Sequence, residues 1–150
     1  MNNQFLTTLF TLFFFGLNQT PLLAQTINLE VGRVIIIGDC KKGAQTFEFI
    51  DEYARTLPLD TTKINRETGE GLLDAFFNDK NIDAHRLPCL HTGKKYKIAA
   101  FHTFEVPDPK NPTVKKEQNV MLLYTGYPLT LFWVMLDEAM ASGEIMIPTR

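Results

Sequence analysis

The first 24 residues constrain this chain most, because they have the pattern of a secretory signal peptide. Residues 5–17 form an uncharged apolar run, and Pro21 separates that run from the small residue Ala24. An apolar core, a helix-breaking residue and a small residue before the cut make up the usual export signal. The alternative is an uncleaved membrane anchor, but a spanning helix needs about 20 apolar residues and this run has thirteen. We therefore predict cleavage after Ala24 and a secreted or periplasmic protein with no transmembrane span.

The mature chain, residues 25–150, has the size and charge of one small domain. Removing 24 of the 150 residues leaves 126, which is enough for a single hydrophobic core. All 15 basic and 17 acidic residues lie in this part, so its net charge is −2. Nucleic acids and anionic membranes both select concentrated positive charge. We expect neither of them as the main partner.

Cys40 and Cys89 are the only cysteines of the chain. In an oxidising compartment, a pair of cysteines more often forms a disulfide than stays as two free thiols. We therefore predict a disulfide between them. On the chain-entropy model, closing a loop of this size stabilises the fold by about 4 kcal/mol.

The first half of the mature chain predicts a buried strand followed by two helices. Residues 31–38 include a continuous β-branched run, which is typical of a strand covered on both faces. Residues 44–57 carry apolar side chains at helical spacing, which predicts a helix that ends at Pro58. A shorter helix is expected at residues 72–77. Short strands are also expected at residues 25–30 and 63–65.

The second half predicts an antiparallel hairpin followed by an apolar helix. Residues 95–106 alternate apolar and polar side chains, which indicates a strand, and residues 118–125 are its expected partner after a proline-rich loop at 107–112. Residues 129–141 are strongly apolar and predict a helix, with a terminal strand at 144–148. Together these elements predict an α+β domain, a mixed sheet with an antiparallel C-terminal hairpin and about three helices packed on it.

The order of elements around the two cysteines resembles the thioredoxin superfamily. In that family a strand leads to a cysteine at the start of a helix, and a cis-proline further along packs against that cysteine. Here Cys40 follows the strand at 31–38, and Pro88 directly precedes Cys89, although Gly43 stands where the family has its second cysteine. The resemblance implies a thioredoxin-like fold as the alternative and places the two cysteines side by side. It also implies that Cys40, Cys89 and Pro88 would form any redox site.

The three histidines of the chain are His85, His91 and His102, and their closeness in sequence makes them candidate metal ligands. Imidazole and thiolate groups are the donors that zinc and copper prefer. The spacing matches no standard site, however, and a disulfide at Cys89 would remove its thiolate. We therefore expect no metal and no other cofactor.

No catalytic motif stands out in the mature chain. A Gly-x-Ser-x-Gly motif is absent, since the only serine is Ser142. The predicted last helix is apolar nearly all round, which gives Phe132, Trp133 and Met140 as candidate contacts with a protein partner. We therefore predict a binding protein rather than an enzyme, acting as an accessory part of a cell-envelope assembly. The alternative function is that of a thiol–disulfide protein that uses the two cysteines.

Overall fold

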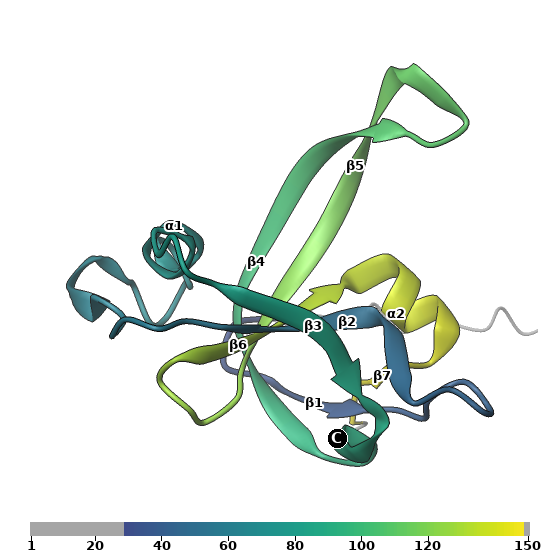
Figure 1. The fold of residues 1–150 in the computed structure, drawn as a ribbon, viewed down its shortest axis with the longest axis horizontal. Helices are drawn as coiled ribbons and strands as arrows, with labels where there is room; N and C mark the ends of the chain where they lie inside the picture. The colour runs from purple at the N-terminus through teal and green to yellow at the C-terminus, as the bar shows by residue number, and fades with distance from the viewer. Residues whose placement is uncertain (1–28, 149–150) are drawn as a thin grey trace, which may run out of the picture.

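The computed structural model describes residues 29–148, in which seven strands form one antiparallel sheet (Figure 1). The strand order is β3-β2-β6-β5-β4-β1-β7. The predicted signal peptide at residues 1–24 and most of the edge strand predicted at 25–30 lie outside the described residues. In chain order the elements are β1 (Val34–Ile37), β2 (Thr46–Ala54), the 3-10 helix η1 (Thr61–Lys63), α1 (Leu72–Phe77), β3 (Asp83–Pro88), the 3-10 helix η2 (Cys89–His91), β4 (Lys95–Asp108), β5 (Asn111–Tyr124), β6 (Thr130–Met135), α2 (Leu136–Ser142) and β7 (Ile145–Met146).

The predicted fold class, a mixed sheet with about three helices packed on it, is wrong. Every strand pair between residues 29 and 148 is antiparallel, and the two α-helices found there have only six and seven residues. The thioredoxin-like alternative is also wrong, because the chain after Cys40 enters strand β2 where that fold needs a helix. The peptide bond before Pro88 is trans, not the cis bond of that family. The domain is a sheet-rich α+β fold.

Strand β2 takes the place of the helix predicted at residues 44–57, and a β-bulge explains the helical spacing of its sequence. The register of β2 against β3 shifts between Thr46 and Asp51. From Thr46 to Asp51, β2 advances five residues while β3 advances two. The strict alternation of faces is therefore broken here, and Phe47 and Ile50, three positions apart, both enter the same core. An interval of three between buried residues is also what a helix produces. The apolar spacing alone therefore indicated the wrong element.

Residues 129–141, predicted as one helix, divide into strand β6 and the short helix α2. Strand β6 is apolar at successive positions because both of its faces are covered. Phe132 and Val134 enter one hydrophobic core, whereas Leu131 and Trp133 pack in the other. A continuous apolar run does not distinguish a buried strand from a buried helix. In this fold the run belongs to a central strand, paired with β2 on one side and β5 on the other.

The predicted antiparallel hairpin is present, and it is longer than expected. Strands β4 and β5 pair along nearly their full length, so most of the predicted loop at 107–112 belongs to the strands. Figure 1 shows this hairpin projecting beyond the rest of the sheet. Three further predictions agree with the structure: β1 lies within the strand predicted at 31–38, α1 matches the helix at 72–77, and β7 lies within the strand at 144–148. The strand predicted at 63–65 is absent, because Lys63 ends the 3-10 helix η1 and the next two residues belong to no helix or strand.

The sheet carries a hydrophobic core on each of its faces. Helix α2 contributes Ala139 to the core that contains Ile98 and Phe132. Helix α1 contributes Phe76 to the second core, which contains Leu122 on the opposite face of the sheet. In Figure 1 the two helices accordingly lie well apart. No helix between residues 29 and 148 is long and apolar enough to cross a membrane.

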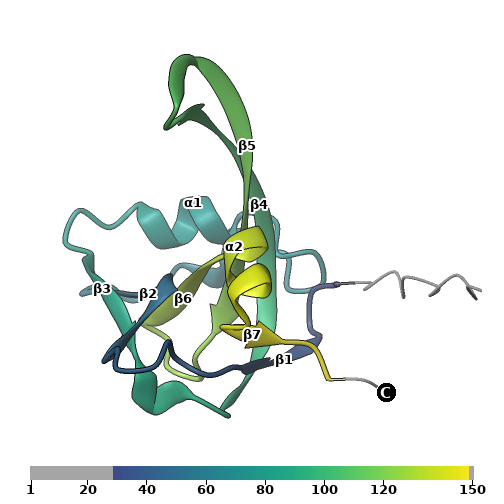
Figure 2. The ribbon, with the colours of Figure 1, turned by 90° about the vertical axis from the view of Figure 1, so that its right-hand side faces the viewer.

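Two contacts connect the side of the sheet formed by β1 and β7 to the side formed by β2 and β3. The predicted disulfide between Cys40 and Cys89 is present, with Cα atoms 5.7 Å apart, and it ties the β1–β2 connection to the end of β3. Glu144, directly before β7, is 3 % exposed. Its carboxylate accepts hydrogen bonds from the backbone N–H groups of Glu48 (2.7 Å) and Phe49 (2.8 Å) at the β2 bulge. Because β3 and β7 are the edge strands, these contacts close the curved sheet (Figure 2).

Replacing Glu144 by Gln should lower the free energy of unfolding by about 1–3 kcal/mol. The amide keeps one acceptor oxygen but turns its NH₂ group toward a backbone N–H that then has no acceptor. Urea unfolding measures the difference. The control Glu48→Gln makes the same chemical change on an exposed side chain and should stay within about 0.5 kcal/mol of wild type. Equal stability of the two variants would contradict the proposed role of Glu144.

Removing the disulfide in the double variant Cys40→Ala, Cys89→Ala should lower the free energy of unfolding by about 4 kcal/mol. The bond spans 49 residues of sequence, and without it the unfolded chain regains the entropy of that loop. Urea unfolding of the variant, and of wild type with and without a reductant, provides the measurement. Reduced wild type should match the variant. A variant as stable as oxidised wild type would show that the bond does not hold the fold.

Candidate functional site

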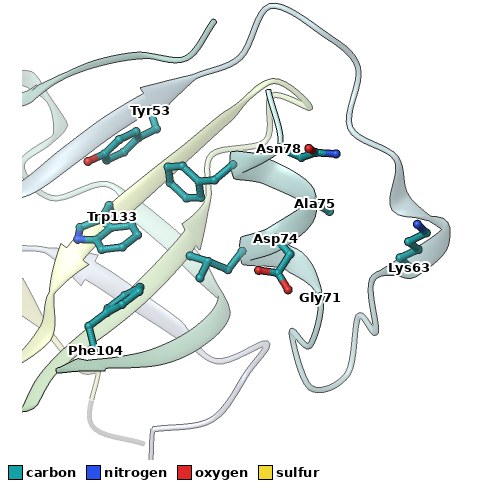
Figure 3. A pocket seen from close by; sticks show the side chains of 10 residues that line it. Tyr53, Lys63, Gly71, Asp74, Ala75, Asn78, Phe104 and Trp133 are labelled. Atoms are coloured by element: carbon teal, nitrogen blue, oxygen red, sulfur yellow. The ribbon is translucent and has the colours of Figure 1, made fainter. Parts of the chain in front are cut away.

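A cleft of about 890 Å³ lies between helix α1 and the outer face of the sheet (Figure 3). Strands β2, β4 and β6 form one side of the cleft, and α1 forms the other. Its volume is within the range of sites that bind small molecules. The residues that line it are Tyr53, Lys63, Gly71, Leu73, Asp74, Ala75, Phe77, Asn78, Phe104 and Trp133.

Four aromatic rings from four different elements form the apolar wall of this cleft. The centroid of the Trp133 ring lies 5.3 Å from that of Phe104, 5.7 Å from Phe77 and 5.8 Å from Tyr53. The Trp133 and Phe104 rings are stacked, whereas Phe77 meets Trp133 edge-on. All four side chains are partly exposed. Rings that pack on one another and still reach solvent give a rigid apolar surface that a ligand can cover.

Backbone geometry explains how the rings come together. Tyr53 and Trp133 are diagonal neighbours in the pairing of β2 with β6, and diagonal side chains on one face of a sheet are within reach of each other when they are aromatic. Phe77 is brought to the cleft by α1, whose N-cap residue Gly71 has a φ of 79°. A side chain at that glycine would overlap the carbonyl oxygen of Lys63. Glycine therefore allows α1 to start close against η1 and to face the sheet.

Three polar side chains, Lys63, Asp74 and Asn78, also line the cleft, and Figure 3 shows Lys63 and Asn78 on the side of α1 away from the rings. All three are exposed, and neither charged group forms an ion pair with another residue of the described range. Burial raises the pKa of the Tyr53 phenol, and the nearby Asp51 carboxylate raises it further. The phenol therefore keeps its proton at neutral pH. The cleft combines an apolar wall with hydrogen-bond donors and acceptors in the same lining.

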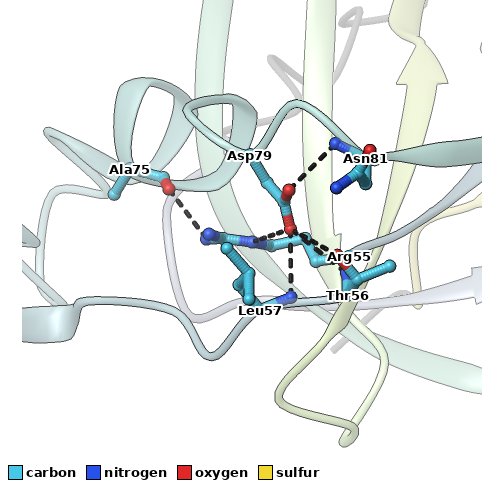
Figure 4. Close-up of polar contacts among 6 residues, drawn as sticks. All are labelled: Arg55, Thr56, Leu57, Ala75, Asp79 and Asn81. Atoms are coloured by element: carbon cyan, nitrogen blue, oxygen red, sulfur yellow. Dashed lines mark hydrogen bonds and ion pairs between the residues drawn. The ribbon is translucent and has the colours of Figure 1, made fainter.

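The side of the cleft formed by α1 is held in place by the buried carboxylate of Asp79 (Figure 4). The Nε atom of Arg55 lies 3.8 Å from this carboxylate, and its Nη1 atom donates a hydrogen bond of 2.8 Å to the carbonyl oxygen of Ala75 in α1. The carboxylate also accepts three backbone hydrogen bonds of 2.9 to 3.1 Å, from the N–H groups of Thr56, Leu57 and Asn81. The end of β2 and the end of α1 are thus fixed to each other.

Of the three residues predicted to contact a partner, the structure places one in the cleft. Trp133 lies at the centre of its aromatic wall. Phe132 points to the opposite face of β6 and is 1 % exposed in the first core. Met140 lies on α2 and is partly buried against the same core. The other rings of the cleft were missed, because they lie far apart in sequence and form no motif.

The structure does not bring the three histidines together. The Nε2 atom of His85 lies 3.2 Å from the carboxylate of Glu52, and the Nδ1 atom of His91 lies 2.6 Å from the hydroxyl of Tyr96. Burial lowers the pKa of His91. His102 is exposed on β4. Within residues 29–148, no group of three or more His, Cys, Asp or Glu side chains is placed to hold a metal ion.

The residues that the thioredoxin resemblance implied do lie together, but in a different setting. Cys40 is in the connection between β1 and β2, and Cys89 opens η2 directly after Pro88. No helix begins at Cys40, so the helix terminus that would favour its thiolate is missing. The disulfide ties two sides of the sheet. Exchange of this disulfide with other thiols stays a prediction from the sequence.

Comparison with known protein families, curated proteins and solved structures gives no match to this chain. The chemistry of the cleft therefore rests on its own residues. They provide apolar contact and hydrogen bonding, and the lining holds one cation and one carboxylate. Such a lining is suited to binding, and no pair of side chains in it is arranged as a nucleophile with its base.

Asp79 should make stability depend on pH. Hydrogen bonds from the N–H groups of Asn81 and Leu57 hold its pKa below the usual range, more strongly than burial raises it. The unfolded chain therefore binds this proton at a higher pH, near 4. The stabilisation is present above that pH and is lost as pH falls through the lower pKa of the folded state.

The variant Asp79→Asn should melt several degrees lower than wild type at pH 7, and the difference should shrink as pH falls from about 5 to 3. Thermal melting followed by circular dichroism at several pH values checks this. The matched control Asp83→Asn, at an exposed position on β3, should follow the wild-type curve. If the gap between Asp79→Asn and wild type stays constant with pH, the titration of Asp79 does not stabilise the fold.

Proposed function

We propose that this protein is a binding protein that takes a saccharide in the aromatic cleft. The observation that carries the proposal is the partly exposed aromatic wall around Trp133, together with the exposed polar side chains of the same lining. A sugar ring has an apolar face of C–H groups and an edge of hydroxyl groups. The C–H face matches the electron-rich faces of the aromatic rings. The hydroxyl groups match the hydrogen-bonding groups of Lys63, Asp74 and Asn78.

The charge of the lining favours a neutral ligand. An anionic ligand is attracted by Lys63 but repelled by Asp74, and the reverse holds for a cationic one. A purely apolar ligand would cover these groups and offer them no hydrogen bond, which costs free energy. A neutral polyhydroxyl ligand avoids both penalties, because each hydroxyl can donate to the carboxylate or accept from the ammonium group.

The expected affinity is modest. A ring contact contributes about 0.5–1.5 kcal/mol, and a hydrogen bond contributes about 0.5–1.5 kcal/mol, or more when one partner is charged. A few of each correspond to dissociation constants from about micromolar to millimolar. Such values suit a protein that holds on to a polymer through repeated units.

A location outside the cytoplasm suits this function. The pattern of residues 1–24 predicts export, and the disulfide between Cys40 and Cys89 is compatible with an oxidising, extracellular environment. Saccharide polymers are components of cell envelopes. In this proposal the protein is an accessory part of an envelope assembly, and the cleft attaches it to such a polymer.

Trp133 is the only tryptophan of the sequence, so its fluorescence reports on the cleft directly. Titration with neutral oligosaccharides derived from cellulose, chitin and xylan should give a saturable change in emission for at least one of them. The absence of a saturable change with every oligosaccharide would contradict the proposal. A change with a proline-rich peptide alone would make the cleft a peptide-binding groove instead.

Variants of the polar lining and of the aromatic wall separate specific binding from a general effect on the fold. Asp74→Ala should weaken saccharide binding about tenfold, the loss expected for a charge-assisted hydrogen bond. Phe104→Ala should weaken it by a similar factor, because Trp133 loses its stacked neighbour. The control Asp83→Ala, on exposed β3, should bind like wild type. If Asp74→Ala and Phe104→Ala bind the saccharide as tightly as the control and wild type do, the saccharide does not bind in the aromatic cleft.

A further inference from the structure

A second cavity, of about 550 Å³, lies on the other side of the segment that carries α1. It is bounded by the connection between β2 and α1 and by the turn between β5 and β6. Its lining is mainly apolar, and its principal apolar side chains are Leu59, Ile64, Phe76, Tyr124, Leu129 and Leu131. Phe76 and Leu131 belong to the second core, so the cavity opens directly onto buried apolar surface.

Arg66 is the only charged residue that lines this cavity. It forms no ion pair with any residue between 29 and 148. The other polar side chains in the lining are hydroxyl groups, those of Thr61, Tyr124, Tyr127 and Thr130. The cavity therefore has one unpaired cation and no carboxylate, in contrast to the balanced charges of the aromatic cleft.

We infer that this cavity binds a small amphipathic carboxylate, such as a medium-chain fatty acid. The alkyl chain of the ligand packs against side chains of the second core, and this contact removes apolar surface of both from water. The carboxylate pairs with the guanidinium of Arg66, whose planar fork matches two carboxylate oxygens at once. A neutral or cationic head group forms no such ion pair, and an alkyl chain without a head group leaves the guanidinium of Arg66 without a partner in the cavity.

Both walls of the cavity are ordered before any ligand binds, which lowers the entropy cost of binding. On one side, the side chain of Asn65 accepts hydrogen bonds from the backbone N–H groups of Glu67 and Thr68, and this turn contains Arg66. On the other side, the Thr125 hydroxyl accepts from the N–H of Tyr127 and donates to the carbonyl oxygen of Thr130.

The loop that carries Arg66 is also fixed to the sheet. Gly69 has a φ of 76°, and a side chain there would overlap the carbonyl oxygen of Ala99 and the Cβ atom of Ala100. Only glycine lets the loop lie this close to β4. Arg66 is thus presented from a supported turn beside the cavity, as a binding site requires.

Isothermal titration of the full chain with decanoate and with decanol tests this inference. The two probes share the alkyl chain and differ in charge. Wild type should bind decanoate about tenfold more tightly than decanol, the preference expected for one charge-assisted pair. Arg66→Met should bind decanoate and decanol with about equal affinity, and its affinity for decanol should equal that of wild type. Lys80→Met, which removes an exposed cation outside the cavity, is the matched control and should behave like wild type.

The inference is overturned if wild type binds neither probe, if it binds both equally, or if Arg66→Met keeps the preference for decanoate. The fluorescence of Trp133 separates this site from the cleft, because decanoate should leave saccharide titrations unaffected in both wild type and Arg66→Met. Circular dichroism shows whether each variant is folded. A loss of decanoate binding with intact saccharide binding identifies the second cavity as an independent site.

Discussion

The closure of the sheet by the buried carboxylate of Glu144 is the interaction on which the rest of the structure depends. Burying a carboxylate costs several kcal/mol, and here two short backbone hydrogen bonds at the β2 bulge offset that cost. The disulfide between Cys40 and Cys89 connects the same two sides of the sheet at a second point, between the β1–β2 connection and the end of β3. With the two sides connected, Phe132 and its neighbours have a closed interior. The outer face of the sheet is then left for the segment that carries α1, and both cavities form where that segment meets it.

A single polar cluster supports both cavities. Arg55 and Asp79 fix the end of β2 to α1, and α1 separates the aromatic cleft from the apolar cavity. Phe76 lines the cavity and Phe77 lines the cleft, so two successive residues of one helix face two different sites. The charges of the two linings differ, with one acid and one base around the cleft and a lone arginine at the cavity. Ligands of different chemistry can therefore bind on the two sides of one helix.

Strands β1, β4 and β5 and helix α1 agree with the prediction from the sequence. The alternation at residues 95–106 predicts a strand, because polar and apolar positions follow the pleat. Where both faces are buried, as in β6, the periodicity disappears and strand cannot be told from helix. At Phe47 and Ile50 the bulge produces a false helical interval. Trp133 was named as a contact residue from the apolar character of its segment, and it lies in the cleft on a strand instead of a helix. Tyr53, Phe77 and Phe104 meet it only through the sheet pairing and the docking of α1, which no local pattern records.

The most direct test of the cleft as the binding site is a two-dimensional ¹H–¹⁵N NMR titration with the oligosaccharide that gives the strongest fluorescence response. The predicted result is a set of saturable shifts confined to the Trp133 indole N–H and to backbone amides around Tyr53, Phe104 and α1, with the tip of the β4–β5 hairpin and α2 unchanged. Shifts centred on the hairpin tip or on α2, or no saturable shifts at all, would contradict the assignment of the cleft as a saccharide site.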